Sequence, residues 1–193
     1  MTELSMHILD VAENGIRAGA DRITVSIEET ASPPVLCICI NDNGKGMDPE
    51  HVEKALDPFF TTKAGKKVGL GLNLLAQSAR RTGGTLNIMS ESGSGTELRA
   101  VYDPSHPDMQ PMGNMIDTLI MLMLSSPGVT FIYNHKFDGK SFEWTTAQLK
   151  EHFQDDNFSR PDILIYTRHK LETGFHSLGL NPANPLSVRP LVE

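Results

Sequence analysis

The spacing of apolar residues divides the first hundred residues into helices and strands. Between residues 3 and 18, apolar side chains recur every three or four positions, which predicts an amphipathic helix. Residues 21–28 alternate apolar and polar, and residues 35–40 form a short apolar run after a Pro-Pro turn, so the two stretches predict an antiparallel hairpin. The later pattern predicts helices over 49–56 and from residue 72, and strands over 85–90 and 98–102.

These elements predict an α/β fold, a two-layer sandwich in which helices cover a mixed, mostly antiparallel sheet. We expect this domain to span residues 1–103 and a linker rich in Pro and Asp to follow over 104–111. A Met-rich helix pattern and a hairpin signal at Asp138-Gly139 predict a small C-terminal α/β appendage over residues 112–175, packed on the first domain. The prolines of residues 176–193 predict a partly disordered tail.

Charge and hydropathy exclude several classes of protein. The chain has 193 residues and a net charge of −7, so nonspecific binding to nucleic acid or to anionic membranes is disfavoured. The longest apolar run, residues 115–124, contains Asp117 and is too short to span a bilayer. No signal-peptide pattern precedes the first helix, so we expect a cytoplasmic location. Cys37 and Cys39 share one strand face, and we expect reduced thiols in the core rather than metal ligands.

The loop after the second predicted strand, Asn41-Asp42-Asn43-Gly44-Lys45-Gly46-Met47, carries the first candidate chemistry. Glycines at 44 and 46 permit positive φ and a close approach of ligand to backbone. Asp42 stands at the strand end, where its carboxylate can accept a hydrogen bond from a ligand amine. In isolation, an ordinary Asx turn explains this loop as well.

A polar stripe on the first predicted helix carries the second set of candidate functional residues. Asp10 and Asn14 are one helical turn apart, and Arg17 follows in the next turn, so their side chains project on one side. An amide oxygen is a hard ligand suited to Mg²⁺, and a carboxylate can position a water molecule or take its proton. The alternative is a solvated helix face without chemistry.

Residues 57–72 form a Gly-, Thr- and Lys-rich segment that opens an apolar-periodic helix. Unpaired backbone N–H groups and the helix dipole favour phosphate at such a helix start, and Lys63, Lys66 and Lys67 add positive charge. The spacing of a Walker A loop is absent. A flexible polar loop before a helix is the alternative.

In this order the motifs resemble the GHKL superfamily of ATPases, which includes gyrase, heat-shock chaperones, histidine kinases and mismatch-repair proteins. The resemblance covers residues 4–102. It rests on four stretches: DVAENGIRAGA, similar to the mismatch-repair N box; NDNGKGM, similar to the first glycine box; DPFFTTKAGKKVGLGL, similar to the lid and second glycine box of histidine kinases; and GSGTELRAVY, similar to the last glycine box.

The resemblance implies ATP and Mg²⁺ as cofactors and assigns roles to residues. Asp42 would bind the adenine amino group with support from Thr96, and Asn14 would hold Mg²⁺. Asp10 falls at the position of the general base, where many members carry the longer glutamate. The other implied nucleotide-binding residues are Arg17, Gly44, Gly46, Met47, Thr61, Thr62, Lys63, Gly69, Leu70, Gly71 and Leu72.

The N box begins almost at Met1, so we expect no preceding helical hairpin with a phosphorylated histidine. The resemblance then implies a stand-alone protein kinase or a slow ATPase with a protein substrate or regulatory partner. A non-catalytic interaction switch controlled by ATP and ADP is the alternative, and a homodimer is compatible with both. A mismatch-repair-like DNA protein rests on the N box alone, and the net charge of −7 disfavours it.

Overall fold

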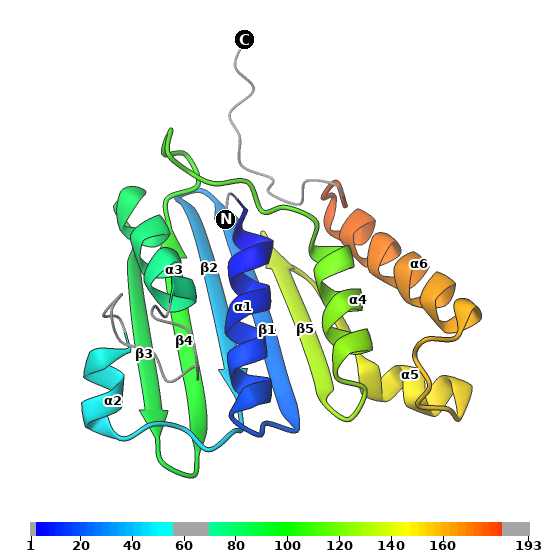
Figure 1. The fold of residues 1–193 in the computed structure, drawn as a ribbon. Coiled ribbons are helices and arrows are strands. Elements are labelled where there is room, and N and C mark those ends of the chain that lie inside the picture. The colour runs from blue at the N-terminus through cyan, green and yellow to red at the C-terminus, as the bar shows by residue number, and fades with distance from the viewer. Residues whose placement is uncertain (1–2, 56–69, 183–193) are drawn as a thin grey trace.

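The computed structural model describes residues 3–55 and 70–182 of the chain. Figure 1 shows the arrangement of the helices and strands. In chain order they are α1 (Leu4–Arg17), β1 (Arg22–Ala31), β2 (Pro34–Asp42), α2 (Pro49–Lys54), α3 (Leu70–Arg81), β3 (Thr85–Glu91), β4 (Gly95–Tyr102), α4 (Met115–Ser125), β5 (Thr130–Phe137), β6 (Lys140–Thr145), α5 (Thr146–Phe153) and α6 (Pro161–Leu178).

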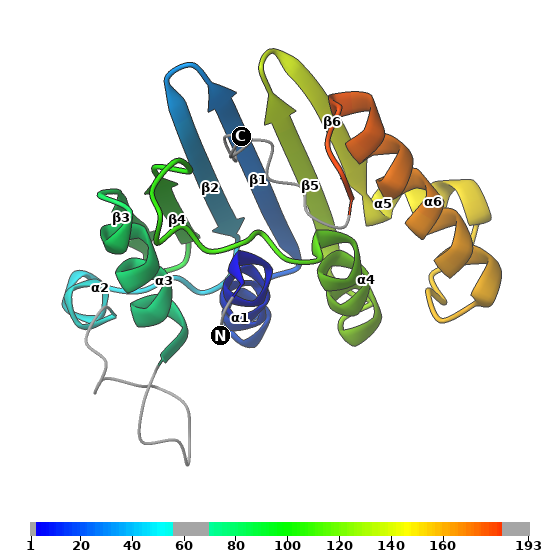
Figure 2. The same ribbon diagram turned by 90° about the horizontal axis from the view of Figure 1, so that it is seen from above.

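The strands form one mixed, six-stranded sheet in the order β3-β4-β2-β1-β5-β6. All neighbouring pairs are antiparallel except β1 and β5, which are parallel. Helices α1, α3 and α4 lie side by side on one face of the sheet, and α5 and α6 lie at its β6 end (Figures 1 and 2). The predicted fold class, an α/β sandwich with a mixed and mostly antiparallel sheet, is confirmed.

The C-terminal half extends the sheet of the N-terminal half. Strand β5 runs beside β1, with Ile23 opposite Phe131 and Val25 opposite Tyr133. The hairpin to β6 turns at Asp138 (φ 43°) and Gly139 (φ 84°), and two positive φ angles are what a type I′ turn requires. The sequence pattern predicted this hairpin but carried no signal for its pairing with β1.

The segment predicted as a linker holds the start of α1. Leu4 N–H donates to the Pro111 carbonyl over 3.0 Å, and Ser5 N–H donates to the Met112 carbonyl over 2.7 Å. These bonds satisfy backbone donors that have no partner inside a helix at its first turn. The buried His7 adds a contact, with its Nε2 atom 3.3 Å from Gln110 Oε1. Residues 110–112 therefore fix the position of α1 on the sheet.

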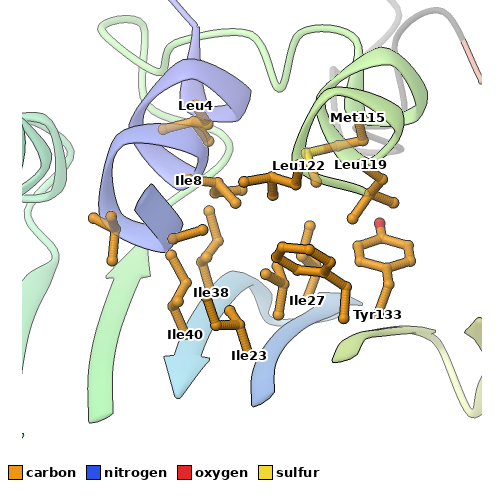
Figure 3. Close-up of a cluster of buried hydrophobic side chains, with 14 of the residues drawn as sticks. Leu4, Ile8, Ile23, Ile27, Ile38, Ile40, Met115, Leu119, Leu122 and Tyr133 are labelled. Carbon is orange, nitrogen blue, oxygen red and sulfur yellow. The ribbon is translucent and has the colours of Figure 1, made fainter. Parts of the chain in front are cut away.

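The core lies between the helices and the sheet. Figure 3 shows side chains of α1, α4, β1 and β2 meeting in one cluster. Leu4 and Ile8 of α1 and Leu122 of α4 are completely buried, as is Ile38 of β2. Burial of each such side chain stabilises the fold by about 1.5–3 kcal/mol. This packing holds α1 rigidly against β2, which matters because both carry candidate site residues.

The placement of the cysteines differs from the prediction. Cys37 and Cys39 are half-buried on the face of β2 opposite the helices, while Leu36, Ile38 and Ile40 occupy the core-facing positions. The prediction of core-facing thiols is wrong because a strand that is apolar on both sides does not show which set faces the core. The guanidinium of Arg99 donates from Nε to Cys37 Sγ over 3.3 Å.

The C-terminal segment begins as ordered structure. Helix α6 continues to Leu178, and Leu178 and Leu180 are buried, so the first residues of the predicted tail are packed. Residues 183–193 lie outside the described part of the chain. Within the described ranges, every helix is too short or too polar to cross a membrane.

Candidate functional site

The carboxylate of Asp42 lies where the end of β2 meets α1. Ile38 and Ile40 are buried against the helices, and alternation along the strand turns Asp42 toward the same face. A Cβ atom placed on Gly15 would lie 2.8 Å from the Cβ atom of Asp42. Gly15 is therefore needed for α1 to approach Asp42 this closely.

Backbone donors and partial burial set the properties of the Asp42 carboxylate. Gly44 N–H donates to Asp42 Oδ1 over 2.9 Å, and Thr96 N–H also donates to the carboxylate. Burial is the largest influence, and it raises the pKa of Asp42 above the ordinary value of 3.8 although both donors lower it. A poorly solvated carboxylate is a strong acceptor for a ligand N–H group.

The two glycine loops fit closely against each other. Gly46 has a φ of 64°, and a Cβ atom there would lie 1.9 Å from the Glu91 carbonyl oxygen. Gly95 has a φ of 93°, and a Cβ atom there would lie 2.0 Å from the Asp42 carbonyl oxygen. Glycine is required at both positions by conformation and by space. The loops after β2 and before β4 thus form one wall around Asp42.

Ser90 joins these loops and was missed by the sequence analysis. Its hydroxyl accepts a hydrogen bond from Met47 N–H over 2.8 Å and donates to the Gly95 carbonyl over 2.8 Å. It also lies 2.9 Å from Thr96 Oγ1. The register Ser90 opposite Thr96 in the β3–β4 hairpin was the only signal that could have indicated it.

Asp10 lies against the start of α3. A Cβ atom placed on Gly71 would lie 1.6 Å from Asp10 Oδ2, so the carboxylate occupies the space beside the first turn of α3. Gly71 is buried and Asp10 is half-buried. The end of a helix at which backbone N–H groups point outward favours negative charge. The predicted base position and the predicted phosphate position are therefore adjacent.

Asn14 lies one helical turn after Asp10 and next to Gly15 on α1. Its amide oxygen accepts a hydrogen bond from Arg17 Nη1 over 2.8 Å, and Arg17 also forms an ion pair with Glu13. The half-exposed amide oxygen is of the type that Mg²⁺ prefers, so Asn14 fits the predicted metal role once Arg17 turns away. The described residues contain no cluster of three or more His, Cys, Asp or Glu side chains able to hold a metal.

The structure thus places most predicted site residues around one region between β2, α1 and α3. Arg17 contacts this region through Asn14, and Met47 through Ser90. Four predicted residues, Thr61, Thr62, Lys63 and Gly69, lie outside the described residues. Leu70 begins α3, and its side chain also lies outside. Leu72 follows in the first turn of α3 and packs partly against the core.

Comparison with known proteins identifies related sequences. The profile of the family described as "Histidine kinase-, DNA gyrase B-, and HSP90-like ATPase" matches residues 2–106, more than half of the 193 residues. A probable C4-dicarboxylate sensor kinase of Bacillus subtilis is 37% identical over 81 residues, which cover 42% of this chain and 15% of that protein. Sporulation kinase C of the same organism is 34% identical over 101 residues, 51% of this chain and 23% of the kinase. In both matches this chain therefore spans less than a quarter of the relative's length.

A solved structure supports the fold. The N-terminal domain of a DNA repair protein superposes with a TM-score of 0.52 at 15% sequence identity. The superposition covers 74% of this chain and 52% of that one. At this identity the likeness concerns the fold alone.

Proposed function

Because the chain belongs to the family of histidine kinase-, DNA gyrase B- and HSP90-like ATPases, we propose that it is a cytoplasmic protein that binds Mg-ATP. We further propose that it transfers the γ-phosphate to a protein partner or hydrolyses ATP slowly. The observation that carries the proposal is a pair of close approaches on α1, of Gly15 to Asp42 and of Asp10 to Gly71.

These two contacts lie at different points along α1, as the base and the phosphates of a bound nucleotide would. Gly15 and Asp10 are five residues apart on α1, about 7.5 Å along the helix axis. Adenine binds at the Asp42 end, where the carboxylate accepts a hydrogen bond from the exocyclic amine. The phosphates extend toward Gly71, where N–H groups of the first turn of α3 point outward. Gly44 packs against Ala18 and Gly46 packs against Glu91, which fixes the loop beside the Asp42 carboxylate.

Asn14 would hold Mg²⁺ through its amide oxygen, and the bound metal would neutralise charge on the phosphates. Arg17 competes for the same oxygen in the structure. Its release from Asn14 would leave the guanidinium near the phosphates, where it can balance negative charge. The Asn14→Ala variant should therefore retain adenine recognition and lose the dependence of ATP affinity on Mg²⁺.

Asp10 is the residue of this chain that would act as the general base. Its carboxylate lies beside the phosphate end of the site, where it can orient a water molecule or a partner's hydroxyl group and accept its proton. Aspartate is one methylene shorter than glutamate, which limits its reach to the nucleophile. A short base at this place favours slow hydrolysis.

A second candidate function is an ATP- and ADP-controlled interaction switch with little chemistry. One contact favours it: the N-terminus of α1 is hydrogen-bonded to the Pro111 and Met112 carbonyls that lead into the C-terminal half. A shift of α1 on nucleotide binding would pass directly to that half. Partners that change between ADP and a nonhydrolysable ATP analogue would support the switch, and identical partners in both states would contradict it.

The first experiment uses γ-labelled ATP and magnesium with the purified 193-residue chain. Free phosphate and labelled protein are measured for the wild type, for Asp10→Ala, and for Asp108→Ala as a control on an exposed loop. Turnover that is lost in Asp10→Ala and retained in Asp108→Ala supports the proposal that the chain is a kinase or an ATPase. Tight binding without turnover supports the switch. Unchanged ATP affinity in Asp42→Asn would contradict both.

A further inference from the structure

A cavity lies far along the sheet from Asp42, at β6. It has a volume of about 570 Å³ and is lined by residues of β6, α5 and α6. Pockets of a few hundred Å³ suit a large side chain or a small ligand. Because the sheet order places β1 and β5 between β2, which carries Asp42, and β6, this cavity belongs to a site separate from the nucleotide site.

The cavity follows the backbone edge of β6. Four consecutive residues, Phe142 to Thr145, line it. Successive side chains of a strand point to opposite faces of the sheet, so what these residues share is their backbone. β6 is the terminal strand of the described sheet and pairs with β5 along one edge. Its other edge presents N–H and C=O groups that can pair with an added strand.

Trp144 adds an unsatisfied donor. Its side chain is only 3% exposed, and its indole Nε1 atom makes no hydrogen bond to any described residue. A buried N–H group without an acceptor costs about 1–3 kcal/mol. Trp144 also lines the cavity, but its Nε1 atom is closed off from the surface, so the residue reports on the cavity without donating to an occupant.

The walls and rim indicate which peptide fits. His152 stacks on Tyr166 with ring centroids 4.7 Å apart and an interplanar angle of 15°, and Lys170 Nζ lies 5.6 Å from the Tyr166 ring centroid, so these three side chains form one wall. The rim carries the exposed carboxylates of Glu143 and Glu151 and the exposed ammonium of Lys170. The carboxylates outnumber the ammonium, and the whole chain carries a net charge of −7. Both features favour a basic occupant.

We propose that the β6 edge and this cavity form a docking site for an extended, basic segment of a protein partner. The segment adds a strand to β6, places a large apolar side chain in the cavity, and pairs lysine or arginine with Glu143 and Glu151. This site does not depend on the function of the nucleotide site.

The test uses Trp144, the single tryptophan of the chain, as its reporter. The probe is an acetylated, amidated hexapeptide with a central phenylalanine flanked by lysines, titrated into the 193-residue chain while tryptophan emission is recorded. We expect a saturable change in emission. The Glu143→Lys/Glu151→Lys variant should bind about five- to tenfold more weakly, because two rim charge pairs are reversed. The matched Glu53→Lys/Asp108→Lys variant, with exposed carboxylates elsewhere, should bind like the wild type.

Two further probes separate strand addition from other occupants. The glutamate-flanked peptide should bind weakly to the wild type and regain affinity with Glu143→Lys/Glu151→Lys. The lysine peptide with N-methylated backbone amides should lose at least tenfold in affinity, because it cannot donate to the β6 edge. Equal binding of the methylated peptide, or of phenylalanine amide alone, would identify a small-ligand pocket and overturn the proposal. No emission change with the lysine peptide at millimolar concentration would also overturn it.

Discussion

The guanidinium of Arg17 donates to the amide oxygen of Asn14 over 2.8 Å, at the position where the nucleotide site would hold its metal. One oxygen therefore has two competing partners, an arginine of its own helix and Mg²⁺. Arg17 is half exposed, and within the described residues its guanidinium is held by this bond and by the ion pair with Glu13. The competition is weak enough for a bound nucleotide to reverse it.

Removal of Arg17 should ease metal binding. In Arg17→Ala the Asn14 oxygen has lost its internal donor, so the Mg²⁺ concentration at half-maximal ATP binding should fall about two- to tenfold, the equivalent of one hydrogen bond. Magnesium titration at fixed ATP, followed by calorimetry, measures this. Arg168→Ala, which removes an ion pair with Asp117 on the outer helices, is the control and should leave the midpoint unchanged. A higher midpoint in Arg17→Ala would mean that Arg17 acts mainly on the phosphates.

Asp42→Asn should abolish nucleotide binding, because the amide in place of the carboxylate no longer provides a charged acceptor for the adenine amine. We expect at least a hundredfold loss in affinity, since charge-assisted bonds in poorly solvated sites are the strong ones. Isothermal titration calorimetry measures it. Asn41→Ala, one residue earlier and exposed on the opposite side of the strand, should retain wild-type affinity. Equal losses in both variants would point to damage to the loop.

The same Asp42→Asn substitution should stabilise the protein near neutral pH. Burial raises the pKa of Asp42 above 3.8, so the folded protein holds this proton more tightly than the unfolded chain does. The free energy of unfolding of the wild type therefore falls as the pH rises through the interval that begins near 3.8. The advantage of Asp42→Asn should appear above this interval and shrink as the pH falls through it. Urea unfolding at a series of pH values tests this, and a constant difference would contradict it.

Gly71→Ala should damage catalysis through Asp10. The added Cβ atom would overlap Asp10 Oδ2, which must move away from the phosphate end of the site. We expect ATP turnover to fall about tenfold or more while the fold is retained, because alanine is favourable in a helix. Gly128→Ala is the control, since nothing lies within 4 Å of a Cβ atom there.

A double-mutant cycle with Asp10→Ala checks the mechanism of this effect. The Gly71→Ala/Asp10→Ala variant removes the overlapping carboxylate, so the second substitution should add little to the loss caused by the first. Additive losses would show that Gly71 acts independently of Asp10.

A buried polar pair joins the two halves of the sheet. His135 Nε2 of β5 lies 2.7 Å from Glu29 Oε1 of β1, and both side chains are at most 1% exposed. His135→Leu should lower the free energy of unfolding by about 3–5 kcal/mol, because it removes this partner from a buried carboxylate. Urea denaturation measures it, with the exposed His169→Leu as the control. Glu29→Leu/His135→Leu should lose less than the sum of the single variants, and strict additivity would refute the coupling.

The local sequence determined much of the fold. Periodicity and turn residues together predicted α1, the β1–β2 hairpin, the strands β3 and β4 and the turn at Asp138-Gly139, because side-chain spacing and glycine conformation act within a few residues. The same applies to the motifs, since Asp42, Gly44 and Gly46 stand next to one another in the chain. Asp10 and Asn14 share one side of a helix for the same reason.

The tertiary structure decided which distant segments meet. Pairing of β5 with β1, the contact of Asp10 with Gly71, and the bonds of Ser90 join residues far apart in sequence, and no local pattern encodes such partners. Packing also decided that Cys37 and Cys39 face away from the helices, because an apolar strand fits a core by either face until the rest of the chain covers one. The cavity beside Trp144 forms because α5 and α6 fold back against the last strand. Burial of the apolar faces of these helices stabilises the fold by more than the unpaired indole N–H of Trp144 costs.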